Sequence, residues 1–339
     1  MTWLVWRQYR NQAYFAAAAL AAFAVLLLIT GRQMTSQYHS ALSLCSASHN
    51  CGNLANTVTL GTPLLSLLVT LTVAVPCVLG IFWGGPLVAR EFEAGTNQFA
   101  WTQSISRRHW LTAKAGWALL AAAAWGGIVS ALVTWWSSPV NALEHQNFQP
   151  AQFDIQGIVP VGYAVFAVAL GVAVGTLLRR ALPAMAITLV VFTFVRLVVG
   201  QDFRSRYLTA VTETFGFLQR AGHRPAVPTG SYWLVSKGLV GPHGLVPTSQ
   251  PNGGGISVGV RGFPSINLTN MPSACQALVF RNPRGVFPCL TAHGYRGLFI
   301  TYQPADRYWA FQGIETGIFV LLAAALIAVT AIVVLRRDA

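Results

Sequence analysis

Residues 86–96 read Pro-Leu-Val-Ala-Arg-Glu-Phe-Glu-Ala-Gly-Thr, and this stretch lies between two strongly apolar runs of the chain. Three of its residues, at positions 90, 91 and 93, are charged, although charged residues make up only 9% of the chain. Pro86 suits the first turn of a helix, and Gly95 suits the position just past its end. We therefore predict a two-turn helix over this stretch. A charged helix between two membrane spans would offer a soluble protein a surface to push against.

The composition indicates that most of the chain lies in a membrane. Of its 339 residues, 54% are hydrophobic, and the charged fraction is well below the roughly one quarter that is usual in soluble proteins. The net charge is +13. The arginines are scattered in ones and twos at the ends of apolar runs rather than gathered in a stripe. This pattern favours membrane topology over nucleic-acid binding, with membrane lipids as partners.

Six apolar runs have the roughly 20 residues needed to cross the hydrocarbon core of a bilayer. The first is followed by Gly31-Arg32-Gln33 rather than by a small-x-small cleavage site, so we interpret it as a retained span and not as a signal peptide. We therefore predict an all-α polytopic membrane protein. Its six transmembrane helices are expected at residues 14–30, 63–82, 115–136, 158–178, 181–200 and 309–335.

Lysine and arginine in the short connections indicate the orientation. On one side, the connection 31–61 contains Arg32 alone, and 137–157 contains no lysine or arginine. The opposite side, which we predict to be cytoplasmic together with both termini, has Arg7, Arg10, Arg90, Arg107, Arg108, Lys114, Arg179, Arg180, Arg336 and Arg337. We expect the plasma membrane as the location. Residues 1–12 suit either a helix lying in the membrane interface or an aromatic flank of the first span.

Residues 201–307 form the one sizeable soluble segment. Turn signals such as Pro228-Thr229-Gly230 alternate with short strand-like runs such as 298–302. We predict a small extracellular domain here. The expected domains are residues 1–200 with an N-terminal interfacial helix, five spans and the charged helix at 86–96, residues 201–307 as the outer domain, and residues 308–339 as the sixth span with a basic C-terminus.

Four of the five cysteines lie in predicted outer segments, where an oxidising environment favours disulfides. Three connectivities are possible, and the local pairs Cys45–Cys51 and Cys275–Cys289 are the simplest. The fifth, Cys77, lies inside the second span and is expected to be a small buried hydrophobe. None of the cysteines has zinc-site spacing, so no metal site is predicted.

The sequence proposes no catalytic site. A Walker A loop ends in Gly-Lys-Ser/Thr, and neither Lys114 nor Lys237, the two lysines of the chain, follows such a loop. The sequence also has no His-Glu-x-x-His motif and no pair of carboxylates inside a predicted span. We therefore expect no enzymatic activity, no catalytic residue and no cofactor in this chain.

Two charges lie inside predicted spans. Arg196 lies about one turn from the outer end of the fifth span, and Glu315 about two turns from the outer end of the sixth. A charge buried in a membrane is costly unless it is paired or faces water. We hypothesise that the two side chains meet, as a structural ion pair or at the outer mouth of a pathway. Snorkelling of Arg196 alone is the alternative.

Motifs occur in the charged helix, just after it and around the start of the last span. They are Val88-Ala-Arg-Glu-Phe-Glu-Ala-Gly-Thr96, Phe99-Ala-Trp-Thr-Gln-Ser104, Arg107-Arg-His-Trp110 with Lys114, Tyr302-Gln-Pro-Ala-Asp-Arg-Tyr-Trp309 and Ile314-Glu-Thr-Gly317. With the order of the spans, they resemble the permease subunit of an ABC-2-type exporter, in particular the actinobacterial permeases of that group. The resemblance covers essentially the whole chain, but nothing carries over to 201–307. It implies an ABC-2 (type V exporter-like) fold with a small outer domain between helices 5 and 6.

The resemblance also implies partners. Each permease would pair with a second copy or a paralogue, and each would dock on a separate ABC ATPase subunit that holds ATP and Mg²⁺. The coupling helix that docks on the ATPase would be 86–96, with contact residues Arg90, Glu91, Phe92, Glu93, Gly95 and Thr96. The expected function is export of a hydrophobic or amphipathic compound (a drug, antibiotic, lipid or peptide), as in multidrug resistance. A membrane-embedded enzyme acting on lipid and a non-transporting ABC-type sensor are the alternatives.

Overall fold

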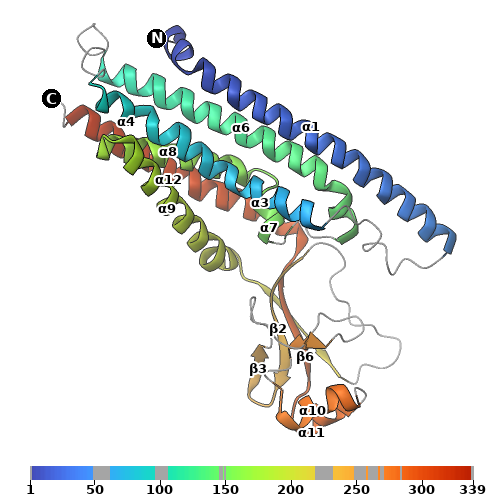
Figure 1. The fold of residues 1–339 in the computed structure, drawn as a ribbon. Coiled ribbons are helices and arrows are strands. Elements are labelled where there is room, and N and C mark those ends of the chain that lie inside the picture. The colour runs from blue at the N-terminus through green and yellow to red at the C-terminus, as the bar shows by residue number, and fades with distance from the viewer. Residues whose placement is uncertain are drawn as a thin grey trace. The chain divides into compact units, whose positions relative to one another are not determined.

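The computed structural model describes residues 2–48, 62–95, 106–144, 148, 150–217, 232–247, 257–258, 266–267, 271–282 and 285–336. The chain forms two compact units (Figure 1). The first consists of Met1–Arg204 and Trp309–Ala339, and the second consists of Ser205–Tyr308. The first unit therefore extends a few residues beyond position 200, where the sequence suggested the limit.

The first unit is helical. Its elements are α1 (Thr2–Ser48), α3 (Thr62–Leu79), η1 (Gly80–Gly84), α4 (Gly85–Glu93), α6 (Arg107–Glu144), α7 (Pro150–Phe153), α8 (Val159–Leu178), α9 (Ala181–Val198), η2 (Val199–Phe203), η3 (Arg204–Arg206) and α12 (Tyr308–Arg336). Over the described residues, six helical segments are long and apolar enough to cross a membrane, at Ala17–Ser40, Leu67–Glu93, Arg107–Ser138, Val159–Leu178, Ala181–Arg206 and Ala305–Arg336. The prediction of a six-span membrane protein is confirmed.

The charged helix is not a separate element between two spans. The π-helical segment η1 joins α3 directly to α4, so that one helical run continues from the second span to Glu93. Pro86 does lie in the first turn of α4, and Gly95, with a φ of +67°, follows its end. Along this run, Gly80 and Gly84 pack their backbone closely against α8, where a Cβ would come within 2.7 Å of a carbonyl oxygen.

The first helix is also longer than expected. α1 is continuous from Thr2 to Ser48, so no break sets off an interfacial helix at residues 1–12, and the helix continues beyond residue 30. The sequence of α1 contains no proline that would interrupt it. Gly31 lies where a Cβ would come within 3.0 Å of the Trp135 ring, so this glycine serves close packing against α6 rather than a helix stop.

The first unit has two ends, which are named here by their helices. At the α4 end, α4 and α8 end while α6 and α9 begin. At the opposite end, called the α7 end, α8 begins and α9 ends. A core cluster near the α4 end includes Leu87, Val88 and Trp110, which are buried together with residues of α8. Because the first half of α4 is buried and Arg90 is exposed, α4 is anchored by its apolar residues and presents its last turn at the surface.

The second unit is built around an antiparallel sheet. Its strand order is β1 (Val211–Gly216), β6 (Gly297–Gln303), β2 (Trp233–Gly241) and β3 (Gly244–Pro247). The central strand β6 is nearly all buried, and the strand-like run 298–302 lies within it. Two short helices, α10 (Ser273–Arg281) and α11 (Val286–Ala292), and the strand pair β4 (Ser257–Val258) and β5 (Ile266–Asn267) complete the described part. The second unit thus combines strands with short helices, so the all-α description holds for the first unit alone.

A tyrosine and a carboxylate join two of these strands. The Tyr302 hydroxyl in β6 donates a 2.7 Å hydrogen bond to the Glu213 carboxylate in β1. Burial of the ring, together with this hydrogen bond and the charge of Glu213, raises the pKa of Tyr302 to about 12. The phenol therefore stays protonated, and keeps this bond, throughout the physiological pH range.

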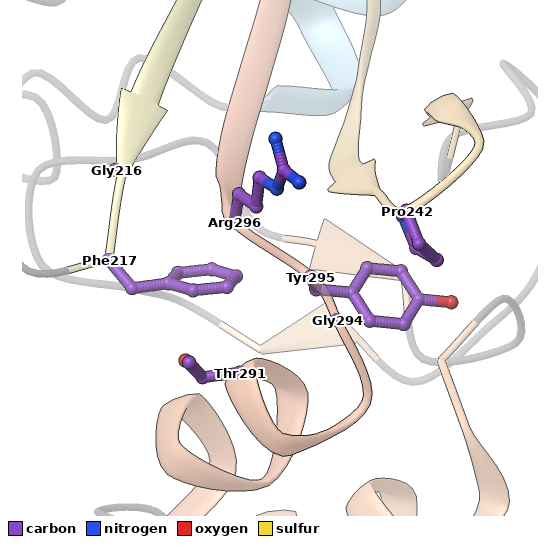
Figure 2. Close-up of a pocket in the computed structure, with 7 residues that line it drawn as sticks. All are labelled: Gly216, Phe217, Pro242, Thr291, Gly294, Tyr295 and Arg296. Atoms are coloured by element: carbon purple, nitrogen blue, oxygen red, sulfur yellow. The ribbon is translucent and has the colours of Figure 1, made fainter.

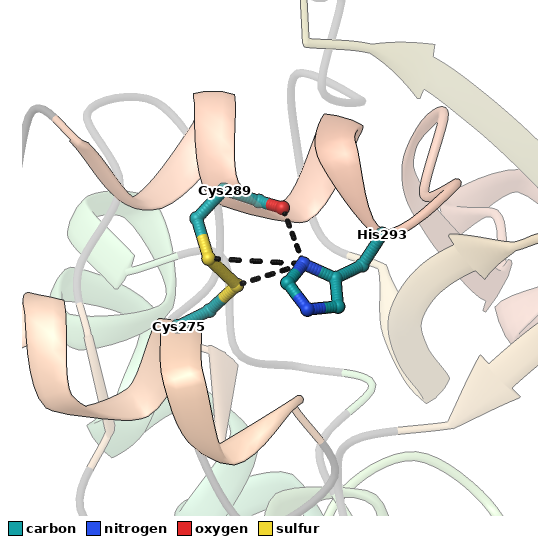
Figure 3. A group of neighbouring side chains, drawn as sticks. All are labelled: Cys275, Cys289 and His293. Carbon is teal, nitrogen blue, oxygen red and sulfur yellow. Dashed lines mark hydrogen bonds between the residues drawn. A yellow bond between two sulfur atoms is a disulfide. The ribbon is translucent and has the colours of Figure 1, made fainter.

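A disulfide links α10 to α11. Cys275 and Cys289 are bonded to each other, and the His293 Nδ1 lies 3.8 and 3.9 Å from the two sulfurs (Figure 3). The same nitrogen lies 2.9 Å from the Cys289 carbonyl oxygen. Both sulfurs are therefore committed to the disulfide. For the other proposed pair, Cys51 lies outside the described residues and Cys45 lies in α1; the fifth cysteine, Cys77, is a free, half-buried thiol.

We expect removal of this disulfide to destabilise the second unit. Closing a loop of about 15 residues constrains the unfolded chain by about 3 kcal/mol. The double variant Cys275→Ser with Cys289→Ser should therefore exchange the backbone amides of β6 and α10 faster than wild type, by hydrogen-exchange mass spectrometry on the full chain. Cys77→Ser is the control and should leave exchange in this unit unchanged. Non-reducing peptide mapping that finds Cys275 unlinked in the wild type would contradict the prediction.

Candidate functional site

At the α4 end, the charged residues of α4 bind neighbouring helices of the same chain. The Lys114 ammonium of α6 forms a salt bridge with the Glu91 carboxylate, and both side chains are largely buried. The Phe92 ring packs edge-on against the Trp110 ring, with the ring centroids 6.4 Å apart. Just past the end of α8, the Arg179 guanidinium lies 5.0 Å from the centroid of the same phenylalanine ring. Contacts of this kind stabilise the position of α4 against α6 and α8.

Glu93 caps a different helix. Its carboxylate accepts a 3.0 Å hydrogen bond from the backbone N–H of Ala181, in the first turn of α9. The N-cap residue of α9, Arg180, provides no side-chain cap of its own. A negative charge at a helix N-terminus satisfies an otherwise unpaired N–H and is favoured by the helix dipole. The last turn of α4 therefore holds the start of α9.

The residue between α8 and α9 has an unusual backbone. Arg179 has a φ of +54° and is the one non-glycine residue with positive φ in the described part of the chain. The left-handed conformation costs free energy for any residue with a Cβ, and it is found where surrounding contacts over-determine it. Here the backbone N–H of Arg179 bonds to the Gly175 carbonyl, which ends α8, and the guanidinium lies over Phe92.

These contacts change the interpretation of the predicted docking residues. Arg90, Glu93 and Gly95 are exposed, whereas Glu91 and Phe92 are half-buried among residues of α6 and α8. Thr96 lies outside the described residues. The sequence marked this stretch as distinctive, but it could not reveal that Lys114, Trp110, Arg179 and the start of α9 are its partners. The sequence did contain one signal for such a partner, which is the basic pair Arg179-Arg180 between two predicted spans.

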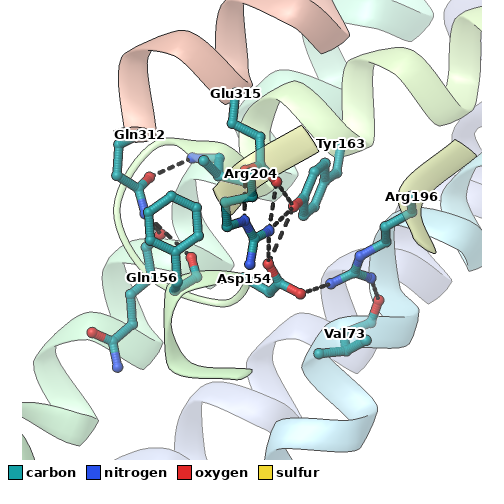
Figure 4. Close-up of polar contacts among 10 residues, drawn as sticks. Val73, Asp154, Gln156, Tyr163, Arg196, Arg204, Gln312 and Glu315 are labelled. Carbon is teal, nitrogen blue, oxygen red and sulfur yellow. Dashed lines mark hydrogen bonds and ion pairs between the residues drawn. The ribbon is translucent and has the colours of Figure 1, made fainter. Parts of the chain in front are cut away.

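The α7 end contains a buried network of charges (Figure 4). Its centre is Glu315 of α12, which is fully buried. The Arg204 guanidinium donates two hydrogen bonds to this carboxylate, from Nε at 2.8 Å and from an Nη at 2.6 Å. The Tyr163 hydroxyl of α8 donates a further bond to Glu315 and lies 3.1 Å from Arg204. Bidentate arginine–carboxylate pairs are among the strongest protein hydrogen bonds.

Asp154 extends this network to two further helices. Following α7, it forms salt bridges with both Arg204 and Arg196. The Arg196 guanidinium of α9 also donates a 2.7 Å hydrogen bond to the Val73 carbonyl of α3, and it lies 4.6 Å from the centroid of the Tyr163 ring. Two guanidiniums and two carboxylates thus meet, so the network is balanced in charge. Figure 4 shows these side chains converging from separate helices.

The hypothesis of a direct Arg196–Glu315 ion pair requires correction. The salt bridge of Arg196 is with Asp154, and that of Glu315 is with Arg204. The two residues belong to one network, but other charges lie between them. Arg204 was missed because the fifth span was ended at residue 200. In the structure, η2 and η3 continue the helical run from α9, which carries Arg204 into the buried site.

A buried glutamine organises the backbone beside this network. The Gln312 Oε1 of α12 accepts 2.9 Å hydrogen bonds from the backbone N–H groups of Ile158 and Val159, where α8 begins. Its Nε2 donates 3.2 Å bonds to the carbonyls of Phe153 and Gln156. One side chain thereby satisfies helix-end groups that would otherwise be buried without partners, since α8 has no side-chain cap at its own N-cap.

This arrangement is suited to holding helices together. Each carboxylate oxygen of Glu315 is bonded to Arg204, and the network brings together α3, α8, α9, α12 and the turn after α7. Buried charges are tolerated when each has a partner and become costly when one partner is removed. The network therefore links four spans at the α7 end, as the contacts of Glu91, Phe92 and Glu93 link α4, α6, α8 and α9 at the other.

The second unit has a surface pocket of about 580 Å³ (Figure 2). The residues lining it are Gly216, Phe217, Pro242, Thr291, Gly294, Tyr295 and Arg296. This lining contains no carboxylate, imidazole or thiol that could act as a general base or nucleophile. Residues 255–259 match Gly-x-Ser-x-Gly, but Ser257 pairs with Asn267 in the strand pair β4–β5 rather than standing on a strand-to-helix turn.

A comparison with known families identifies the first unit. A family model described as ABC-2 membrane transporter related matches residues 17–204, which is more than half of the chain. The match includes α4 and its partners on α6, α8 and α9. It also includes the charge-network residues that precede the second unit in sequence, which are Asp154, Tyr163, Arg196 and Arg204. No curated protein and no solved structure matches the chain. The chain belongs to the ABC-2 membrane transporter related family.

Proposed function

We propose that the chain is the membrane-spanning subunit of an ATP-driven exporter, and that a separate ABC ATPase subunit supplies the energy. Family membership and the six spanning helices support a permease. The absence of a Walker A sequence in the chain supports a separate ATPase. A pair of permeases, as two copies or with a paralogue, would face two ATPases.

The observation that carries this proposal is the way α4 is held. Its apolar half is buried, while Glu91, Phe92 and Glu93 bind α6, α8 and α9. A force on the exposed last turn would therefore act on several spans at once. Interfaces that are close-packed move as bodies and switch between discrete arrangements. ATP-driven closure of two ATPases at this end would change access at the other.

The orientation follows from the same proposal. The α4 end carries the arginines that the positive-inside rule assigns to the cytoplasm, so both termini would be cytoplasmic. The second unit would then be extracellular, where its disulfide is favoured. The buried side chains of the spans are mostly apolar, which suits a hydrophobic or amphipathic cargo such as a drug, antibiotic, lipid or peptide.

Reconstituted transport tests the proposal. The chain, co-expressed with ABC ATPases of its host and purified with any that bind, should drive ATP-dependent movement of a lipophilic cationic dye in proteoliposomes. An ATPase variant whose Walker B glutamate is replaced by glutamine is the control and should abolish movement. ATP hydrolysis without movement of any apolar probe would favour a sensor. Modification of lipid without ATP would favour the enzyme alternative.

A further inference from the structure

We infer that the ATPase-docking surface at the α4 end is cationic, so that the ATPase must present an acidic groove to it. This inference rests on the proposed function and specifies the chemistry of the partner. It narrows the expectation drawn from the sequence, in which the acidic Glu91 and Glu93 contact the ATPase together with the basic Arg90.

Both acidic residues of α4 are already committed within the chain. Glu91 is paired with Lys114, whose ammonium is itself largely buried, and the pair cancels in charge. Glu93 is exposed, but its carboxylate accepts the Ala181 N–H at the positive end of the α9 dipole. An ATPase that bound either carboxylate with a basic residue would have to compete with these contacts, and a buried ammonium left without its partner would be costly.

The exposed charges of this end are mainly positive. Of its described residues, exposed arginines come from four elements or their flanking turns: Arg90 of α4, Arg108 of α6, Arg179 and Arg180 between α8 and α9, and Arg336 of α12. Glu93 is the exposed acid among them. Complementary charge across an interface directs association and fixes its register. A groove lined by aspartate and glutamate is the surface that fits.

The geometry favours a folded partner over lipid headgroups. Arg179 is held in the left-handed conformation and its guanidinium lies over Phe92, so this cation is fixed relative to α4. Arg90 lies in the last turn of a helix fixed to its neighbours. Guanidiniums in fixed positions suit the bidentate binding of fixed carboxylates. A fluid headgroup layer would not require such order.

Charge reversal at two positions tests the inference. Arg108→Glu and Arg90→Glu are introduced separately into the full chain in nanodiscs, and the Kd for the co-purifying ABC ATPase is measured. We expect each reversal to raise the Kd about tenfold. Glutamate in the first turn of α6 is favoured by the helix dipole, so Arg108→Glu should not destabilise the helix. Arg90→Gln and Arg108→Gln should give smaller increases.

Two controls define the outcome. Arg206→Glu reverses an exposed arginine at the far end of the helical run that begins with α9, and it should leave the Kd unchanged. Wild-type binding should weaken as salt rises from about 0.1 to 1 M, over which the screening length falls from about 10 to 3 Å. Binding that is indifferent to salt and to both reversals overturns the inference, although the proposed function would stand.

Lipid is separated from protein by the composition of the disc. If Arg108→Glu weakens ATPase binding only in discs that contain phosphatidylglycerol, the arginines act on headgroups and the inference is overturned. An equal loss in discs of phosphatidylcholine alone supports it. A wild-type chain that binds no ABC ATPase at any salt concentration contradicts the proposed function itself, which is a different result from salt-independent binding.

Discussion

Replacement of Arg204 by methionine is expected to destabilise the helical unit by about 3–5 kcal/mol, the cost of removing one partner from a buried ion pair. Arg204 is 2% exposed and binds Glu315 and Asp154 at the same time. Its loss would remove two hydrogen bonds from the Glu315 carboxylate, which is fully buried. Thermal unfolding of the purified chain in detergent, followed by tryptophan fluorescence, measures the effect.

Nearby variants separate charge pairing from general disruption. Arg206 is exposed and lies two positions from Arg204, so the Arg206→Met variant should unfold like wild type. The double variant Arg204→Met with Glu315→Leu removes both buried charges, so it should be more stable than Arg204→Met alone. Equal unfolding temperatures for Arg204→Met and Arg206→Met would show that the network does not hold the spans together.

Replacement of Gly171 by alanine is expected to have the second large effect, because it acts on the contact between α8 and α4. A Cβ at Gly171 would lie 2.5 Å from the Gly80 carbonyl oxygen and 2.6 Å from the Gly85 nitrogen. These are backbone atoms, which cannot turn aside as a side chain would. Overpacking costs about 1–3 kcal/mol, and here the helices themselves must separate. We expect ATP-driven transport to fall more steeply than the amount of folded protein.

A second helical glycine provides the matched control. Gly116 of α6 has no atom within 4 Å of the position where a Cβ would lie. Alanine is preferred over glycine inside a helix by about 0.5–1 kcal/mol, so Gly116→Ala should be neutral or stabilising. The comparison uses the same chemical change in both helices, with protein amount measured by size-exclusion chromatography and transport measured in proteoliposomes. If Gly171→Ala transports as well as Gly116→Ala, close contact of α4 with α8 is not needed for coupling.

The charge network illustrates how far sequence reasoning can go. Depth along a helix follows from residue number, and by that measure the sequence predicts Arg196 and Glu315 at the same end of the spans. Rotation about the helix axis and the choice between neighbouring partners do not follow from it. Arg204 and Asp154 lay just beyond the apolar runs, where a hydropathy pattern ends, and the helical continuation through η2 brought Arg204 back to Glu315.

The residues of α4 illustrate the same limit at the other end. Their charge and the glycine stop at Gly95 were evident because local propensity and capping act within a few residues along the chain. The partners of Glu91 and Glu93 lie more than twenty and more than eighty positions away in sequence. Such pairings depend on how helices pack, and no local pattern encodes them.

The sequence alone determined that this is a membrane protein with six spans, because the bilayer requires about 20 apolar residues for each helix and this requirement is local. It also marked residues 86–96 as the distinctive charged element. Only the tertiary structure decided which charges are used inside the protein and which remain for a partner. Pairing energies act through space, and in a low-dielectric interior each buried charge binds whichever opposite charge the packing brings within reach.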